Sequence, residues 1–162
     1  MKYPIRSAAA DPLAWLALAV PLNYAFSRAL GAAVRTAVRR SGGAERYEPA
    51  FGLWTCWGGQ GVVRRLDGYG GGTTYGSTYY LAAGDPRSQF GRDFGARLTH
   101  EAAHAAQWLA LGPALAPSYL VAEAIGRLVT GRPGCGNIFE RWAGLESGGY
   151  RCGDGAGQPL WP

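Results

Sequence analysis

Histidine is almost missing from this sequence. Only two of its 162 residues are histidines, and both lie in one short segment, at positions 100 and 104. Cysteine is scarce too: Cys56, Cys135 and Cys152 form an odd set without CxxC spacing, which argues against a thiolate zinc knuckle and a full disulfide framework. One bridge between Cys135 and Cys152 would close a short loop if it faces an oxidising compartment, and buried free thiols fit the sequence equally well.

Charged residues are few as well, at 17% of the chain against 48% hydrophobic residues, which is a globular composition and not a disordered one. The formal net charge is +5. The arginines are nevertheless scattered, and the densest groups are pairs such as Arg39–Arg40 and Arg64–Arg65. No basic segment alternates with aromatic residues in the manner of a nucleic-acid module. We therefore expect a solvated basic surface and no nucleic-acid partner.

A clean transmembrane span is also lacking, because such a helix needs about 20 consecutive apolar residues. The most apolar stretch, 13–33, is interrupted by proline and polar residues, namely Pro21, Asn23, Ser27 and Arg28. Read as a signal peptide, the N-terminus offers Lys2 and Arg6 before an apolar segment at 13–20, but no sharp small-residue cleavage site follows.

A third interpretation treats 13–40 as two helical segments that meet at Pro21, since proline can begin a helix but disrupts its interior. The second segment has an apolar side with Leu30 and Val34, and its arginines add positive charge. It could pack on the domain or make a peripheral contact with an anionic membrane. A cytoplasmic or membrane-associated location is favoured over a secreted one, and the sequence does not indicate the oligomeric state.

The chain length suits a single domain, 1–162, with 1–41 as its N-terminal helical segment. Glycine is abundant, at 26 residues, and gathers mostly in 42–76 and 131–157, where we expect turns and loops. Residues 41–49 are predicted to form a loop. Three short β-prone runs follow, and they predict a small sheet of two to four strands: 51–57, 61–66 and 73–81.

The second half of the chain predicts helices. Apolar periodicity indicates a helix over about 93–111, which Gly112 and Pro113 end. Residues 118–130 form a second predicted helix, and its inner side is expected to carry Leu120, Val121, Ala124, Ile125 and Leu128. Asn137 is a good N-cap for a third, short helix that reaches about Ala143, and the tail from Gly148 is expected to be irregular. The predicted fold class is therefore α+β.

The segment Thr99–Gln107 reads THEAAHAAQ and contains the pattern HExxH. Two histidines four residues apart project from one face of a helix, so the ring nitrogens of His100 and His104 can bind one ion, and zinc suits imidazole ligands. Glu101 can then take the proton of a metal-bound water as that water attacks a carbonyl, and pass it to the leaving amine. No glycine or proline interrupts the segment, which favours the helix that this pattern requires.

If water is to occupy the fourth position, zinc needs a third protein ligand. No third histidine exists, which leaves a carboxylate, and the downstream candidates are Glu123, Glu140, Glu146 and Asp154. Glu140 is favoured because it lies on the short helix predicted after Asn137, and rigid elements hold ligands better than loops do. Glu146 is the alternative, and without that role it could hydrogen-bond a ligand histidine.

The segments Gly72–Leu81, Leu98–Trp108 and Asn137–Tyr150 together resemble small bacterial HExxH metallopeptidases, the DUF4157-like proteins, including uncharacterised actinobacterial ones. The resemblance implies a compact zincin-like domain with a small glycine-rich sheet, an active-site HExxH helix and a later helix bearing Glu140. It does not extend to the N-terminal helices, which only the residue pattern predicts. It also implies that Gln107, in the extended motif HExxHxxQ, supports the site by hydrogen bonding. With no further histidine, the residue that stabilises the oxyanion would be Tyr150, Tyr119 or Arg141.

These observations predict a zinc-dependent hydrolase, a small metallopeptidase that cleaves a peptide or protein substrate with Glu101 as general base. Few residues are left for a substrate-binding subdomain, so we expect a shallow cleft in which an extended peptide lies along a sheet edge. One alternative is a catalytically inactive binding or scaffolding protein that zinc stabilises, which a fourth ligand such as Glu146 or Cys135 would favour. Another is a membrane-associated partner protein whose function lies in 13–40.

Overall fold

The computed structural model describes residues 12–68 and 70–152, with side chains from Val20 onward. A long helix, α1 (Pro12–Arg40), precedes a four-stranded mixed sheet of β1 (Ala44–Glu48), β2 (Leu53–Trp57), β3 (Thr73–Tyr75) and β4 (Thr78–Leu81). The helices α2 (Pro86–Phe90), α3 (Phe94–Leu111), α4 (Leu115–Thr130) and α5 (Ile138–Ala143) follow. Short 3-10 helices lie between these elements: η2 (Gly61–Asp67), η3 (Gly91–Asp93) and η4 (Gly112–Ala114). The predicted α+β class and small sheet are confirmed.

The sheet has the strand order β1-β2-β4-β3, with β1 and β3 at its edges. Only β2 and β4 pair in parallel, and the other two pairs are antiparallel. Each face of β4 packs on a different helix: Tyr80 packs with Val34 and Val38 of α1, and Tyr79 packs with Leu98 of α3. Gly76, in the turn between β3 and β4, approaches α1 closely, since a Cβ there would lie 2.1 Å from the carbonyl oxygen of Ser27.

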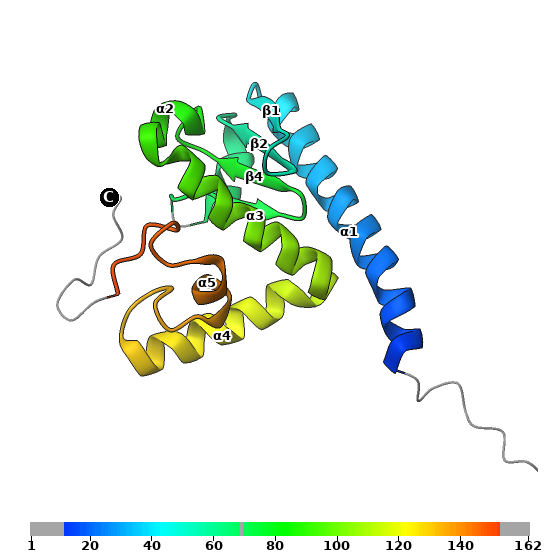
Figure 1. The fold of residues 1–162 in the computed structure, drawn as a ribbon. Helices are drawn as coiled ribbons and strands as arrows, with labels where there is room; N and C mark the ends of the chain where they lie inside the picture. The colour runs from blue at the N-terminus through cyan, green and yellow to red at the C-terminus, as the bar shows by residue number, and fades with distance from the viewer. Residues whose placement is uncertain (1–11, 69, 153–162) are drawn as a thin grey trace, which may run out of the picture.

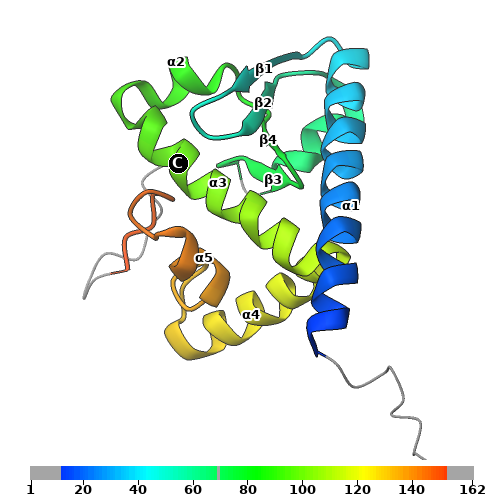
Figure 2. The same cartoon turned by 45° about the vertical axis from the view of Figure 1, so that its right-hand side comes forward.

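Helix α3 lies in the middle of the molecule, with the sheet on one side and α4 and α5 on the other (Figure 1). The view turned by 45° shows the same layers and shows α1 running along one side of the sheet and of α3 (Figure 2). Asn23 of α1 donates a hydrogen bond to the carbonyl of Ala110, near the end of α3, at 3.0 Å. The helix that carries the HExxH pattern is therefore packed against the sheet, against α1, and against α4 and α5.

Helix α1 continues through Pro21, whereas the sequence predicted two helical segments that meet there. Proline removes one intrahelical hydrogen bond, and this helix is 29 residues long, so many other bonds remain on both sides. Val34 and Val38 are buried against the sheet. The peripheral membrane contact that the sequence left open as an alternative for 13–40 is still a prediction.

Strand β1 lies within the 41–49 segment, which was wrongly predicted to be a loop. Its residue Glu48 is buried and pairs with Arg87, at 2.7 Å, from a helix far along the chain. A charged edge strand of this kind lacks the apolar alternation that identifies strands in a sequence. Its partners become visible only in three dimensions.

The expected strand at 61–66 is also wrong, because that segment forms the 3-10 helix η2. The buried carboxylate of Asp67, at the end of η2, accepts hydrogen bonds from the backbone N–H groups of Gly72 and Ala82, at 2.6 and 2.8 Å. These bonds fix a turn between η2 and the following hairpin. Val62 points to solvent instead of into a sheet, with 77% of its surface exposed.

Helix α4 is rotated relative to the prediction from its sequence. The residues assigned to its inner side are exposed, namely Leu120, Val121, Ala124, Ile125 and Leu128. The inner side carries Tyr119, Glu123 and Gly126 instead. Glu123 accepts a hydrogen bond from Asn137 at 3.1 Å, and a Cβ on Gly126 would lie 2.6 Å from the carbonyl carbon of Gly136. A carboxylate bond and a close backbone approach thus orient α4, and apolar periodicity reports neither.

Among the described residues, one helical stretch, Pro86–Thr130, is long and apolar enough by length and composition to cross a membrane. The most apolar window of this stretch is 22% buried. It comprises α2, α3 and α4, which glycines at 91 and 112 separate. Core helices of soluble proteins pass the same test, so it is weak support for a membrane span.

Candidate metal centre

Two helices bring three metal-ligating side chains together. Helix α3 presents His100 and His104, one turn apart, and α5 presents Glu140. His100 Nε2 lies 3.0 Å from His104 Nε2 and 3.1 Å from Glu140 Oε2, and His104 Nε2 lies 3.4 Å from the same oxygen. In the part of the chain that the structure describes, no other group of three histidine, cysteine or acidic side chains could hold a metal ion.

The spacing of the three ligand atoms fits a zinc ion. In a tetrahedral site with bonds of about 2.0–2.1 Å, neighbouring ligand atoms are about 3.3 Å apart. The observed separations run from 3.0 to 3.4 Å. His100 and Glu140 are only 2% and 3% exposed, whereas the side chain of His104 is 12% exposed, so solvent approaches the group past His104.

The Nδ1 atoms of both histidines, on the side of each ring away from the site, make hydrogen bonds that determine which ring nitrogen carries the proton. His100 Nδ1 donates to the carbonyl oxygen of Gly144 at 3.0 Å, and His104 Nδ1 donates to Gln107 Oε1 at 2.9 Å. The amide of Gln107 is oriented in turn, because its Nε2 donates to the carbonyl of Phe139 at 2.8 Å. In the neutral rings both Nε2 atoms are therefore unprotonated, and they face each other and a carboxylate. Three acceptors that converge without a donor form a site for a cation.

Glu140 is prepared as an anionic ligand. The hydroxyl of Tyr119 donates to its Oε1, while the buried Oε2 has no hydrogen-bond donor and faces the two ring nitrogens. Burial alone would raise the pKa of this carboxyl, but the hydrogen bonds and charges of His100 and His104 hold the pKa of Glu140 well below its usual value. The oxygen that faces the histidines is thus the one left for a metal.

The same geometry stabilises a proton when no metal is bound. Burial lowers the pKa of His104, but its hydrogen bond to Glu140 and the charges of Glu101 and Glu140 outweigh that effect and raise the pKa to about 9. A buried ring that holds a proton this tightly lies in a strongly negative environment. The proton occupies the place that a metal cation would take.

Glu101, the expected general base, lies beside this group and is 2% exposed. Its Oε1 pairs with Arg97 at 3.1 Å, one turn earlier on α3, and its Oε2 accepts a hydrogen bond from Thr74 of β3 at 2.8 Å. These two contacts fix the carboxylate between α3 and the edge of the sheet. The base role itself remains a prediction.

A loop after α5, residues 144–150, covers His100. Besides the carbonyl of Gly144, it contributes Gly148, where a Cβ would lie 2.4 Å from Cε1 of the imidazole. The carbonyl of Gly148 accepts a hydrogen bond from Arg97 at 2.5 Å, and Arg97 also donates to the carbonyl of Gly71. Arg97, Gly144 and Gly148 were not predicted from the sequence as site residues. The spacing of Arg97 and Glu101 at i and i+4 was the available signal.

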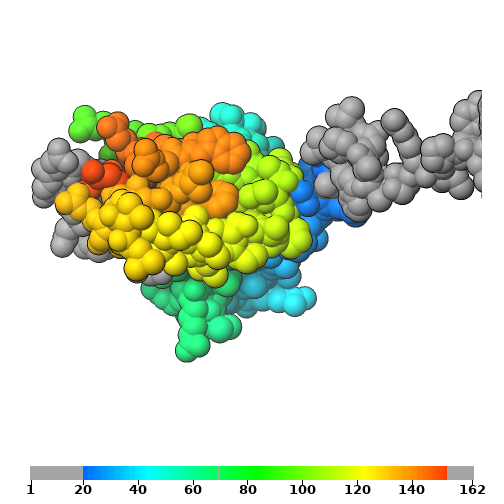
Figure 3. All heavy atoms as spheres, turned by 90° about the horizontal axis from the view of Figure 1, so that it is seen from below, coloured from blue at the N-terminus to red at the C-terminus, as the bar shows by residue number. Residues whose placement is uncertain are grey.

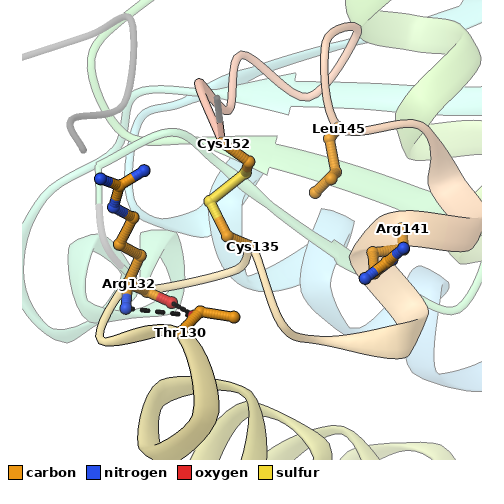
Figure 4. Close-up of a pocket in the computed structure, with 6 residues that line it drawn as sticks. All are labelled: Thr130, Arg132, Cys135, Arg141, Leu145 and Cys152. Carbon is orange, nitrogen blue, oxygen red and sulfur yellow. Dashed lines mark hydrogen bonds between the residues drawn. A yellow bond between two sulfur atoms is a disulfide. The ribbon is translucent and has the colours of Figure 1, made fainter. Parts of the chain in front are cut away.

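The other expected site residues are placed differently. Gln107 binds His104, and Tyr150 lies near the site, with its ring centroid 6.3 Å from that of His100. Glu146 is exposed and lies outside the ligand group, and Asp154 lies outside the described residues. Arg141 is exposed and lines a separate hollow beside the disulfide between Cys135 and Cys152 (Figure 4).

The disulfide joins Cys135 to Cys152, which decides between the two expected states of these cysteines, while Cys56 is a buried free thiol. The bond closes a loop that contains α5 and residues 144–150. Glu140 and the backbone groups that contact His100 therefore belong to one cross-linked segment. This segment completes the ligand set begun by α3.

These features define an α+β protein with a candidate two-histidine, one-glutamate metal site on an HExxH helix. A scan of protein-family models found no match, and searches of curated proteins and of solved structures also found none. The chemistry of the site must therefore be inferred from its own residues.

Proposed function

We propose that this protein is a zinc-dependent hydrolase, a small zincin-like metallopeptidase. The observation that carries the proposal is the convergence of His100 Nε2 and His104 Nε2 of α3 with Glu140 Oε2 of α5, with no donor among them. Helix α3 also carries Glu101. Zinc is the metal of choice because its tetrahedral sites accept imidazole and carboxylate ligands at these separations. When bound, it would polarise a substrate carbonyl and increase the acidity of a water.

The other catalytic roles, those of general base and oxyanion donor, fall to residues of the chain. Glu101 accepts the proton of the attacking water and delivers it to the leaving amine, and Arg97 and Thr74 hold its carboxylate in place. Tyr150 is the favoured oxyanion donor, since its ring centroid lies 6.3 Å from that of His100, and burial raises its pKa so that its hydroxyl stays protonated. Tyr119 is already committed to Glu140.

An extended peptide would reach the site from the exposed side of α3, where Thr99 and Ala106 contact solvent. The strand edge nearest to the site is β3, although the carbonyl of Thr74 already accepts a hydrogen bond from Trp108 at 2.8 Å. Substrate pairing along this edge is therefore restricted at Thr74. This favours a short peptide segment as substrate.

The test is metal content and peptide hydrolysis in one series of variants, purified without chelator. Wild type should contain nearly one zinc per chain, and His104→Ala and Glu140→Ala should lose it. Glu101→Gln should keep the zinc and lose hydrolysis by a factor of about 10² or more, since it lacks the base. Glu146→Ala removes an exposed carboxylate and should match wild type. Zinc retained in Glu140→Ala would contradict the ligand assignment.

A catalytically inactive, zinc-stabilised scaffold is the second candidate, and the burial of His100 and Glu140 favours it. The two candidates differ in whether a ligand position is open. A hydroxamate added to the cobalt-substituted protein should change its visible spectrum if a position is open, as the hydrolase requires. An unchanged spectrum with tightly bound metal would favour the scaffold.

A further inference from the structure

The outer side of α4 is an apolar surface made of five aliphatic side chains. They are among the most exposed hydrophobic residues described: Leu120 (67%), Val121 (60%), Ile125 (57%), Leu128 (87%) and Val129 (78%). We call these five residues the α4 surface. Viewed from below, α4 runs along the near face of the molecule and α5 lies next to it (Figure 3). The inner side of α4 carries Tyr119 and Glu123. The helix therefore turns polar side chains toward the protein and its apolar side toward solvent, the opposite of an ordinary surface helix.

The apolar character continues onto α1. The sequence from 12 to 27 contains no charged residue, and Val20, Leu22 and Tyr24 are 57%, 69% and 55% exposed. This part of α1 adjoins η4, which directly precedes α4, since a Cβ on Gly112 would lie 2.1 Å from the side-chain oxygen of Asn23. The part of α1 that follows residue 20, in blue, is seen at one end of the face that α4 forms (Figure 3).

The exposed charged residues of the span 112–145, which contains α4 and α5, have one sign. Between 112 and 145 the two acidic residues, Glu123 and Glu140, are buried. The basic residues of the same span are Arg127, Arg132 and Arg141, and the side chain of Arg127 is 43% exposed while it pairs with Glu123. Trp142 is 62% exposed beside them, and tryptophan favours the boundary between lipid and water.

We propose that the α4 surface, together with Val20, Leu22 and Tyr24 of α1, docks on an anionic lipid bilayer, with α4 lying in the plane of the headgroups. Aliphatic side chains enter the acyl boundary, and the arginines contact lipid phosphates. A second copy of the chain is a poorer occupant, because a symmetric contact would bring the arginines of both copies together. This inference does not depend on the proposed hydrolase.

The test uses the full chain and vesicles of phosphatidylcholine, either alone or with about one third phosphatidylglycerol, in a sedimentation assay. Val129→Ser removes apolar area from the α4 surface, and Val62→Ser is its matched control, because Val62 is equally exposed, at 77%, on η2. Leu128→Ser removes the most exposed member. Each replaced side chain is exposed, so circular dichroism and zinc content should not change.

We expect wild type to bind the anionic vesicles more tightly than the neutral ones. Val129→Ser and Leu128→Ser should weaken binding about tenfold, the effect of losing one buried aliphatic side chain, and Val62→Ser should bind like wild type. No binding to either vesicle, or equal binding by all variants, would overturn the proposal. A dimer in sedimentation equilibrium that Leu128→Ser dissociates, without vesicle binding, would assign the surface to self-association and overturn it too.

Discussion

At the scale of single residues, Tyr119 has a defined task, which is to fix the carboxylate of Glu140. Burial, together with the charge of Glu140, raises the pKa of Tyr119, so its hydroxyl stays protonated and donates. Tyr119→Phe removes that hydroxyl, and we expect zinc affinity to fall about 10- to 100-fold. Competition against a chelator measures the affinity, and Tyr24→Phe, at an exposed position of α1, should bind zinc like wild type. An unchanged zinc affinity in Tyr119→Phe would contradict this role of Tyr119.

Gly148 is the second single residue with a sharp consequence, because only a missing side chain lets the loop lie against His100. In Gly148→Ala the new Cβ would meet the imidazole at 2.4 Å, and such overpacking costs about 1–3 kcal/mol. We expect a lower melting temperature and weaker zinc binding. Gly95→Ala, at a position of α3 with nothing within 4 Å of the new Cβ, should instead be neutral or slightly stabilising. Equal effects of the two substitutions would show that the contact with His100 is unimportant.

At the scale of elements, the cross-link between Cys135 and Cys152 holds α5 and the loop over His100. The bond closes a loop of 17 residues in sequence separation, for which the loss of chain entropy predicts about 3 kcal/mol of stability. Reduction should therefore lower the free energy of unfolding and the zinc affinity of wild type together.

A double variant, Cys135→Ser with Cys152→Ser, controls for the reductant. It should resemble reduced wild type and should not respond to reductant. Cys56 does not complicate the comparison, because burial raises the pKa of its thiol to about 12 and keeps it unreactive at neutral pH. A reductant effect that persists in the double variant would have to come from another group.

The elements also show how far the sequence predicts this fold. Helices α3 and α5 were predictable because their signals are local: an unbroken periodic run that a glycine ends, and Asn137, whose side chain accepts the N–H of Phe139. The orientation of α4 was not, because an apolar stripe indicates an amphipathic helix and not which side is covered. The spacing of the two histidines was readable in the sequence, and Glu140 was favoured over Glu146 because of its predicted helix. The support of these side chains by the carbonyls of Gly144 and Phe139 depends on the backbone path.

At the scale of the whole molecule, we expect a rise in pH to lower the stability of the metal-free protein and to raise its apparent affinity for zinc. The pKa of His104 is about 9 in the folded, metal-free chain, against the ordinary histidine value of 6.5 in the unfolded chain. The stabilising proton is therefore fully present below about pH 6.5 and is lost as pH rises through 9. Zinc must displace that proton, so its apparent affinity should rise about tenfold per pH unit up to about pH 9. Thermal unfolding without zinc and chelator competition with zinc, both from pH 6 to 9, measure the two trends. Glu140→Gln, which removes the charge that raises this pKa, should flatten the first trend.

The support of the metal centre also determines how its relatives could be found. Behind each ligand histidine stands a main-chain carbonyl, that of Gly144 directly and that of Phe139 through Gln107, and a third carbonyl, that of Gly148, anchors Arg97. Every residue type has a main-chain carbonyl, so these contacts do not constrain the sequence. Distant proteins with the same site could therefore differ at nearly every side chain. What they would share is a spacing: HExxHxxQ, one helix, and then a glutamate followed by glycines four and eight residues later.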